Sequence, residues 1–418
     1  MTYTEHRRKV LDAIPENSLV LVYAGHPAHA NEDSYLEYRP NSQFFWLTGL
    51  ERAGMILVLT NIQGKKGETL YIDQFNPHTE RWTGKMPTKE QAVEVSGIKN
   101  VQYTSAFDSA LDRTMSRMDI RHVYFDTWKC SKSDLPDYNY LKAMEFRKTY
   151  PAVQLHDLHA LVCPMREVKD AEELALIRRA TDITKSALDY VMEQLKPGKY
   201  EYQVQADFEY RCRYEGAKRQ AFTTIAGSGI NGCMMHYVDN NRMLEDGDLI
   251  LLDLGAEYNN YCSDITRTYP ANGRYSPRQR QYYDIVLKAN MAIKEAAKPG
   301  VTLQELNQVA QKTLAEGLIA MGKIKDASEI GKYYMHGCSH SIGVDVHDIN
   351  LGLGVKLQPG WVISDEPGLY IDEEAIGIRI EDDLLITEDG AEYISKDIPR
   401  DADEIEAYMA AHNVYLKK

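Results

Sequence analysis

The sequence predicts two domains of different class: an α/β domain over residues 1–163 and an α+β domain over residues 164–418. A chain of 418 residues is too long for one ordinary hydrophobic core. In the first part, short β-branched runs alternate with helical patterns. The second part contains an internal repeat with a period of roughly a hundred residues, which indicates two related halves.

The first domain is predicted to contain at least four strands, at residues 18–23, 54–59, 69–72 and 122–125. Helical patterns cover residues 87–95 and 105–118, and this alternation is typical of an α/β domain. Few catalytic groups cluster here, so we interpret the domain as structural or substrate-gating. Trp82 stands in a polar, glycine-bearing loop, where it either caps a pocket or subunit contact or packs ordinarily.

The helices of the second domain repeat. One helix begins at Asp170, where Glu173 completes a capping-box pattern, and ends at a Lys-Pro-Gly stop. A second helix over residues 279–297 ends at the same three residues. Each stop precedes a further helix, and these two helices are expected to end at Glu-Gly pairs, residues 215–216 and 316–317.

The strands of the second domain repeat as well. Residues 247–253 and 360–366 each place a glycine, an apolar strand and then an acid six residues after the glycine. Each half is therefore predicted to be a pair of helices with a curved antiparallel sheet. The two acids, Asp253 and Glu366, would meet near the join between the halves.

Each half is predicted to add a second acid through a hairpin. A turn centred on residues 258–259 places Asp253 directly opposite Asp264, and a turn centred on residues 373–374 places Glu366 opposite Glu381. Directly opposed β-carbons lie about 4.5–5.5 Å apart. Two carboxylates that close repel each other unless a proton or a cation lies between them.

Three histidines, His336, His340 and His347, fall within twelve positions and are separated by small residues. Imidazoles so placed suit metal binding and proton handling near neutral pH. Four carboxylates and a histidine make an oxygen and nitrogen site for two divalent ions such as manganese, cobalt, iron or zinc. Two such ions about 3.5–4 Å apart would bridge one hydroxide, which could serve as a nucleophile.

Two further residues are candidates for this site. Arg379 shares a strand face with Glu381 at a spacing of two, which suits a guanidinium that orients a ligand carboxylate, with a plain ion pair as the alternative. His236 follows a glycine-rich run, and its ordinary interpretation is a core histidine. That run, residues 227–232, fits G-x-G-x-x-G, but residues 234–238 read as a strand, whereas a dinucleotide motif must open a helix.

Composition excludes several classes of function. With 62 acidic and 48 basic residues, the chain has a formal net charge of −14, which disfavours nucleic acid and anionic membranes as partners. No stretch approaches about 18 unbroken apolar residues, and no signal-peptide pattern is present, so we expect a cytoplasmic protein. The six cysteines form no C-x-x-C pair and are expected to be reduced.

Four segments resemble the metal-binding blocks of the pita-bread metallopeptidases, in particular aminopeptidase P and prolidase: "LLDLGAEYNNYCSDITRTYP", "MHGCSHSIGVDVHD", "DEPGLY" and "GIRIEDD". In the first domain, "PNSQFFWLTGL" resembles the N-terminal domain of the same enzymes. The resemblance implies a creatinase/aminopeptidase-P-like α/β domain over 1–163. It also implies a pita-bread domain over 164–418, with two pseudo-twofold-related halves and a curved antiparallel sheet covered by helices.

The resemblance further implies a dinuclear site, commonly of manganese, with cobalt, zinc or iron as alternatives. Asp253 and Asp264 would hold one ion, and Asp264 would also reach the second ion, which His340 holds. Glu366 would complete the shell of the second ion and shuttle a proton, and Glu381 would bridge the two ions.

Three more residues would complete the active site by the same resemblance: His236 and His347 would donate to the oxyanion and hold the substrate, and His336 would line the pocket. Arg379, a candidate from its spacing to Glu381, would orient a ligand carboxylate. Phe222 stands where many aminopeptidases P have a tyrosine, so a hydroxyl role there is absent. The loop between Tyr370 and residue 377 is also short, without the long insertion that some relatives have.

We therefore predict an Xaa-Pro aminopeptidase, which releases the first residue from peptides with proline in second position. Xaa-Pro dipeptidase (prolidase) is the close alternative. A non-catalytic binding module of the same fold, or a relative that hydrolyses creatine without metal, is the alternative from another class. Relatives are commonly dimers or tetramers, so a homo-oligomer is expected.

Overall fold

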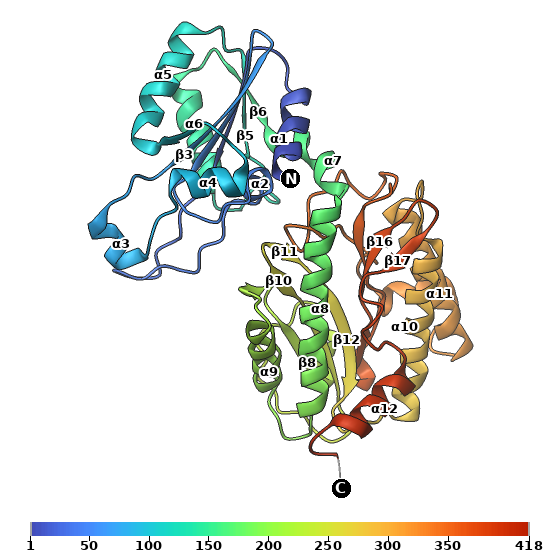
Figure 1. Cartoon of the computed structure of the whole chain (residues 1–418). Helices are drawn as coiled ribbons and strands as arrows, with labels where there is room; N and C mark the ends of the chain where they lie inside the picture. The colour runs from blue at the N-terminus through green and yellow to red at the C-terminus, as the bar shows by residue number, and fades with distance from the viewer. Residues whose placement is uncertain (1, 417–418) are drawn as a thin grey trace. The chain divides into compact units, whose positions relative to one another are not determined.

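The computed structural model describes residues 2–416, and the chain divides into two compact units, Met1–Met165 and Arg166–Lys418 (Figure 1). The boundary predicted between residues 163 and 164 lies inside helix α7 (Leu158–Glu167), which continues through Pro164. Among the described residues, none of the helices combines the length and apolar character needed to span a lipid bilayer. All six cysteines are free thiols, as the sequence predicted.

The first unit is an α/β domain, which confirms the predicted class. Its six-stranded mixed sheet has the order β4-β3-β2-β1-β5-β6, with antiparallel pairing of β2 to β1 and β3 and parallel pairing elsewhere. The strands are β1 (Ser18–Tyr23), β2 (Ile56–Ile62), β3 (Lys65–Ile72), β4 (Val101–Tyr103), β5 (His122–Phe125) and β6 (Gln154–Asp157). The helices before α7 are α1 (Thr2–Ala13), α2 (Ser42–Thr48), α3 (Pro77–Thr83), α4 (Lys89–Ser96), α5 (Phe107–Arg117) and α6 (Tyr138–Thr149), with a 3-10 turn η1 (Thr104–Ala106).

The loop predicted around Trp82 is wrong, because this residue lies on the short helix α3. Its side chain is 80% exposed, so ordinary packing of the indole is also wrong. A role for Trp82 in capping a pocket or a subunit contact stays a prediction.

The second unit contains the predicted repeat of two helices followed by strands. The first half has α8 (Ala171–Gln194), α9 (Glu201–Tyr214), β7 (Arg219–Gln220), β8 (Ile225–Ser228), η2 (Gly229–Cys233), β9 (Leu249–Leu254), β10 (Ala256–Tyr258), β11 (Tyr261–Cys262) and β12 (Ile265–Pro270). The second half has α10 (Pro277–Ala296), α11 (Leu303–Ala320), η3 (Ala327–Lys332), β13 (Val362–Asp365), β14 (Gly368–Ile371), η4 (Asp372–Glu374), β15 (Ile376–Arg379), β16 (Asp382–Ile386), β17 (Ala391–Tyr393) and α12 (Ala402–His412).

The long helices begin with the same local chemistry in both halves. At α8, Asp170 accepts from the first-turn amides while the Glu173 side chain reaches back to the Asp170 amide. At α10, Ser276 and Gln279 form the same reciprocal capping box. Each box satisfies backbone donors that a helix start leaves without partners. The start of α8 thus agrees with the prediction from Asp170 and Glu173.

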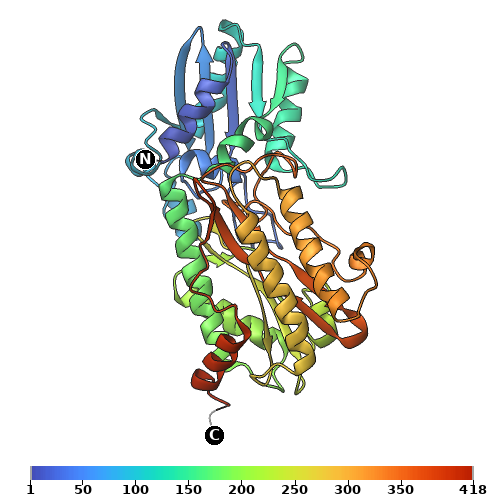
Figure 2. The same ribbon diagram turned by 90° about the vertical axis from the view of Figure 1, so that its right-hand side faces the viewer.

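The predicted end of α11 at a Glu-Gly pair is wrong, because α11 continues through Gly317 to residue 320. α10 and α11 lie side by side (Figure 2). A β-carbon at Gly317 would lie 2.6 Å from Ile285 Cγ2 of α10, so this glycine permits close helix packing instead of ending the helix.

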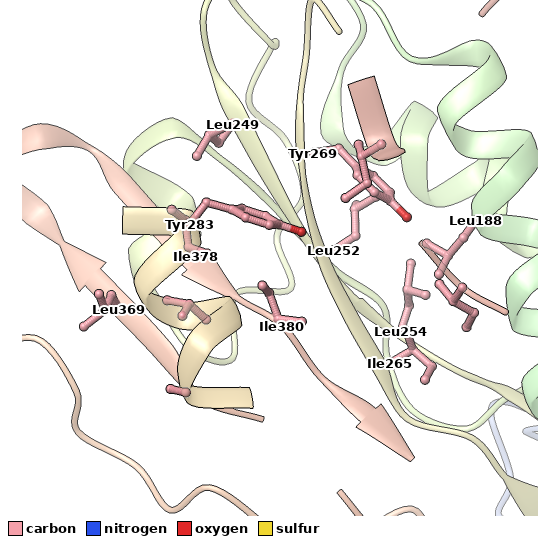
Figure 3. Close-up of a cluster of buried hydrophobic side chains, with 14 of the residues drawn as sticks. Leu188, Leu249, Leu252, Leu254, Ile265, Tyr269, Tyr283, Leu369, Ile378 and Ile380 are labelled. Atoms are coloured by element: carbon pink, nitrogen blue, oxygen red, sulfur yellow. The ribbon is translucent and has the colours of Figure 1, made fainter. Parts of the chain in front are cut away.

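The core of the second unit lies between the helices and the strands of both halves. Figure 3 shows side chains of β9 and β12 next to Leu188 of α8 and Tyr283 of α10. Leu369, Ile378 and Ile380 of the second half belong to the same buried cluster. The halves also join directly, because the Glu381 amide donates to the Thr266 carbonyl oxygen at 3.0 Å.

The first predicted hairpin has the wrong register. Its turn is Asn259-Asn260, and both residues have positive φ, 47° and 61°, which a two-residue turn of this kind requires and asparagine tolerates. β9 and β12 consequently place Asp253 opposite Thr266 and not opposite Asp264. The error is two residues, and strand side chains alternate with a period of two, so the acids remain on one face.

The register predicted for the second hairpin is the one that the structure has. β14 and β15 pair Ile371 with Ile376 and Gly368 with Arg379, around a turn centred on residues 373–374. Continued by two residues, this ladder places Glu366 opposite Glu381. The strand before the hairpin ends one residue earlier than predicted, at Asp365.

The strand predicted at residues 234–238 is wrong, since these residues form a bend, a turn and a loop. β8 leads into η2, a five-residue 3-10 helix, and not into a longer helix. The dinucleotide interpretation stays excluded, because its phosphate site needs the amino end of an α-helix.

Gly377 of β15 lies against the backbone of η2, where a β-carbon would lie 1.9 Å from the Gly232 carbonyl oxygen. Gly377→Ala is therefore expected to lower the free energy of unfolding by at least about 1–3 kcal/mol. Urea denaturation measures this loss. Gly331→Ala is the control, because nothing lies within 4 Å of its added β-carbon, and a loss as large in this variant would contradict the explanation.

Candidate metal centre

A cavity of about 1040 Å³ opens in the second unit and is lined by residues of both halves. Apolar side chains, including Phe222, Ile225 and Val346, form part of its wall. All the site residues predicted from the sequence line it: His236, Asp253, Asp264, His336, His340, His347, Glu366, Arg379 and Glu381.

The five predicted ligands converge on one place in this cavity. Asp253, Asp264 and Glu381 each offer an oxygen, and these atoms lie within 4.8 Å of one another. His340, Glu366 and Glu381 form a second such group, so Glu381 belongs to both. His340 Nε2 lies 3.3 Å from Asp264 Oδ2, 3.6 Å from Glu366 Oε1 and 3.9 Å from Glu381 Oε1.

Ser364 of β13 holds the His340 backbone, and the Ser341 carbonyl orients the His340 ring. The His340 amide donates to Ser364 Oγ at 2.9 Å, and the Ser364 amide donates to the His340 carbonyl oxygen at 2.9 Å. Nδ1 donates to the Ser341 carbonyl oxygen at 3.1 Å, which leaves Nε2 to face the acids. Ser364 also donates to Glu366 Oε1 at 3.2 Å, so one serine fixes two predicted ligands.

The carboxylates are buried and lie so close together that protons or cations must offset their repulsion. Burial, followed by repulsion from Asp253 and Asp383, raises the pKa of Asp264 well above its ordinary value. Burial and repulsion from Asp264 raise the pKa of Glu381 well above its ordinary value. Among the described residues, Asp253 Oδ1 and Asp264 Oδ1 are buried and have no hydrogen-bond partner. Oxygen and imidazole donors with free lone pairs fit two divalent ions.

These raised pKa values predict how metal ions change stability. Between the unfolded pKa near 4 and the raised folded values, the folded chain binds more protons than the unfolded chain, so without metal its free energy of unfolding falls as pH rises. Divalent ions replace these protons, so Mn²⁺ should raise the melting temperature of chelator-treated protein more at pH 8 than at pH 5. Calorimetry at both pH values measures the difference, and equal gains would contradict this explanation.

Arg379 packs against the carboxylates of the centre and is almost fully buried. Its Nη2 donates to Asp253 Oδ2 at 2.6 Å, and its Nε donates to Thr266 Oγ1 at 3.1 Å. Thr266 in turn donates to Glu381 Oε2 at 2.7 Å. Burial alone would lower the pKa of Arg379, but Tyr370 and Asp253 raise it above its ordinary value. A guanidinium placed this way orients two carboxylates, one directly and one through a hydroxyl.

His336 lies at the end of a chain of hydrogen bonds that starts at Arg379. Arg379 Nη1 donates to the Tyr370 hydroxyl at 2.7 Å, and this hydroxyl lies 2.8 Å from His336 Nε2. Nδ1 of His336 donates to the Gly337 carbonyl oxygen at 2.6 Å and lies 3.6 Å from Glu366 Oε2. Burial lowers the pKa of His336, which favours the neutral ring.

His347 and His236 lie on the exposed side of the centre. The ring of His347 packs on that of His340, with centroids 4.1 Å apart. Partial burial and the neighbouring His340 and His236 lower the pKa of His347 to about 4, so it is neutral at pH 7. His236 is exposed in the turn after η2, so its interpretation as a core histidine is wrong.

Three residues of this site were not predicted from the sequence: Thr266, Tyr370 and Ser364. Thr266 follows Asp264 at a spacing of two, which is the pattern that identified Arg379 from Glu381, so a signal for it was present. Tyr370 and Ser364 flank Glu366 in the chain, but nothing in their spacing indicates which side chains they contact.

Buried carboxylates from two related halves of a domain converge here, and neutral histidines lie beside them. This arrangement defines a metal-dependent hydrolase. The chain belongs to metallopeptidase family M24, whose family model matches residues 175–388. The model of the aminopeptidase P N-terminal domain matches residues 3–124.

Similar proteins cover the whole chain. The Xaa-Pro aminopeptidase of Escherichia coli (strain K12) is 33% identical over 98% of this chain and 97% of its own. A solved structure from Bacillus anthracis, provisionally assigned as an aminopeptidase P, has a TM-score of 0.96 at 38% identity and covers 99% of both chains. A glutamate-to-alanine variant of E. coli aminopeptidase P in complex with substrate has a TM-score of 0.88 at 31% identity and covers 98% of both chains. The human Xaa-Pro dipeptidase is more distant, with 29% identity over 95% of this chain and 90% of its own.

Proposed function

We propose that this chain is an Xaa-Pro aminopeptidase, which hydrolyses the bond between an N-terminal residue and a proline in second position. The observation that carries the proposal is the convergence of the five predicted ligands in a cavity that also contains the four other predicted site residues. The relatives that bear the name Xaa-Pro aminopeptidase match nearly the full chain, which supports the same substrate class.

Two divalent ions would be held by the five side chains. Asp253 with Asp264 would hold one ion and His340 with Glu366 the other. Asp264, which also belongs to a group with His340, and Glu381, which belongs to both groups of donors, would reach both ions. When bound, such ions supply an activated water at neutral pH and polarise the scissile carbonyl. Manganese is the proposed physiological metal, with cobalt, zinc or iron as alternatives. The donor set also suits zinc, with which E. coli aminopeptidase P has been solved.

The remaining residues of the centre would bind substrate and move protons. His347, neutral at pH 7, and His236 would donate to the carbonyl oxygen of the scissile bond as its charge develops. His336, held by Tyr370, would line the cavity beside the substrate. The leaving prolyl nitrogen needs a proton, and Glu366, next to His340 and His336, would deliver it.

A comparison of substrate length tests the proposal. We expect an Xaa-Pro-Xaa tripeptide to be cleaved after its first residue, and the Xaa-Pro dipeptide to be turned over more slowly. Chromatography of the released residue gives kcat/KM for both, with Xaa-Ala-Xaa as the control for proline specificity and chelator as the control for metal dependence. Turnover of the dipeptide alone would favour Xaa-Pro dipeptidase, and no turnover of either with metal present would favour a binding module.

Three further properties belong to the same proposal. The chain is expected to act in the cytoplasm, to form a dimer or tetramer, and to bind peptides rather than nucleic acid or membrane. Its net charge of −14 supports the last of these. Sedimentation of the purified protein measures the oligomeric state.

A further inference from the structure

The loop that carries His236 is held from outside the metal centre. This segment, the His236 loop, comprises residues 229–241 between β8 and the chain that leads to β9. Glu201, the first residue of α9, is fully buried beneath it. Burial of an ionised carboxylate destabilises the fold unless hydrogen bonds replace its lost hydration. The hydrogen-bond partners of Glu201 therefore indicate its role.

Glu201 accepts hydrogen bonds from the two residues that flank this loop and from two residues within it. Its Oε1 accepts from the Ser228 amide at 2.6 Å, from Ser228 Oγ at 2.7 Å and from Asn231 Nδ2 at 3.1 Å. Its Oε2 accepts from the Tyr237 hydroxyl at 2.8 Å and from the Arg242 amide at 2.8 Å. All these partners act as donors, so a carboxylate satisfies every one of them, whereas an amide would turn its NH₂ group toward at least one donor.

The position of His236 depends on this arrangement. His236 is exposed on the rim of the cavity, so its backbone fixes where the imidazole lies. The next residue, Tyr237, is buried and bonded to Glu201. On the opposite side, the Gly232 carbonyl approaches Gly377 of β15 so closely that a β-carbon there would not fit. The His236 loop is therefore fixed between α9 and the second half of the domain.

We propose that Glu201 is a positioning residue for His236, and that its carboxylate fixes the His236 loop so that the imidazole faces the metal centre. This inference rests on the proposed function, in which His236 contacts the substrate. Glu201 itself does not line the cavity, so it acts only through the loop.

A double-mutant cycle tests the coupling. E201Q is expected to lower kcat/KM for an Xaa-Pro-Xaa peptide about 10- to 100-fold, as for other residues that orient an active-site group, with unchanged metal content. In the H236A background the same substitution should change kcat/KM by less than about twofold, because the positioned group is gone. Full activity of E201Q, or equal losses in both backgrounds, would overturn the proposal.

A variant with a purely structural defect serves as the matched control. Asn413 is buried, and its Nδ2 donates to the Met192 and Leu195 carbonyl oxygens at 2.8 and 2.7 Å, at the end of α8. Asn413→Ala should lower the melting temperature and leave kcat/KM within about twofold of wild type. A loss of activity in this variant as large as that of E201Q would mean that instability alone explains both, which would overturn the proposal.

Two further measurements keep the test decisive. Should E201Q not fold, Tyr237→Phe removes one donor beside His236. This variant is expected to give a smaller loss in kcat/KM that also vanishes in H236A, and full activity would overturn the proposal.

Amide hydrogen exchange of E201Q should become faster in residues 229–241. If the wild type cleaves no Xaa-Pro peptide, the proposed function fails, whereas faster exchange still supports Glu201 as the anchor of the loop and unchanged exchange overturns it.

Discussion

Asp264→Ala is expected to abolish peptidase activity, with a loss in kcat/KM for an Xaa-Pro-Xaa peptide of at least about a thousandfold, which exceeds the usual cost of losing one oxyanion donor. Asp264 contributes to two of the groups of potential ligands, one with Asp253 and Glu381 and one with His340 and His347. Its removal would leave both ions of the proposed pair with fewer donors. Metal analysis of the purified variant should therefore show less bound metal than the wild type.

The control for this prediction is an acid of the same domain that lies away from the centre. Asp389 is exposed and accepts a hydrogen bond from Thr387 Oγ1 at 3.4 Å, so Asp389→Ala should keep full activity and metal content. Asp264→Ala with wild-type kcat/KM would rule out the proposed mechanism. Reduced activity with normal metal content would instead place Asp264 in substrate binding.

Asp382→Ala is expected to lower the free energy of unfolding by about 3–5 kcal/mol, the usual cost of removing one partner from a buried ion pair. Arg267 Nη2 donates to Asp382 Oδ1 at 2.7 Å, and neither side chain has any exposure. Arg400 and Ser395 donate to the same oxygen at 3.0 and 2.6 Å. Burial alone would raise the pKa of Asp382, but Arg267 and Arg400 lower it below its ordinary value. Without the carboxylate, the Arg267 guanidinium loses its buried counter-charge.

Urea denaturation of chelator-treated protein measures this loss without a contribution from bound ions. Asp403→Ala is the matched control, because Asp403 also pairs with an arginine, Arg280, at 2.5 Å, but its side chain is 79% exposed. Solvent screens such an exposed pair, so its contribution to stability is small. Equal losses in the two variants would show that the Arg267–Asp382 pair is no stronger than a surface pair.

The site could be predicted from the sequence more fully than the strand register that builds it. The turn of the first hairpin was predicted one residue too early, which moved the partner of Asp253 by two residues, although Asn259-Asn260 is a recognisable signal for a turn with two positive φ values. Asp253 and Asp264 nevertheless lie together, because a slip of two residues returns every side chain to the same face. A slip of one residue would have separated them.

Other features depend on contacts that spacing does not encode. Gly317 resembles a helix stop in the sequence, and only the approach of Ile285 from another helix explains why a glycine is needed inside α11. The contact of Glu201 with residues 228–242 joins segments that no local pattern connects. The exposed position of His236 likewise follows from the turn after η2, at residues for which a strand was predicted.

Each half of the second unit supplies an incomplete set of donors to the common centre: Asp253 and Asp264 precede α10, whereas His340, Glu366 and Glu381 follow it. Cleavage in the link between β12 and α10, residues 271–276, would thus leave two fragments with complementary ligands. Neither fragment alone could assemble the pair of cations, and recovered hydrolysis would report that the fragments had reassociated. The repeat therefore predicts that the domain can be divided at this link into two fragments that are active only when they associate.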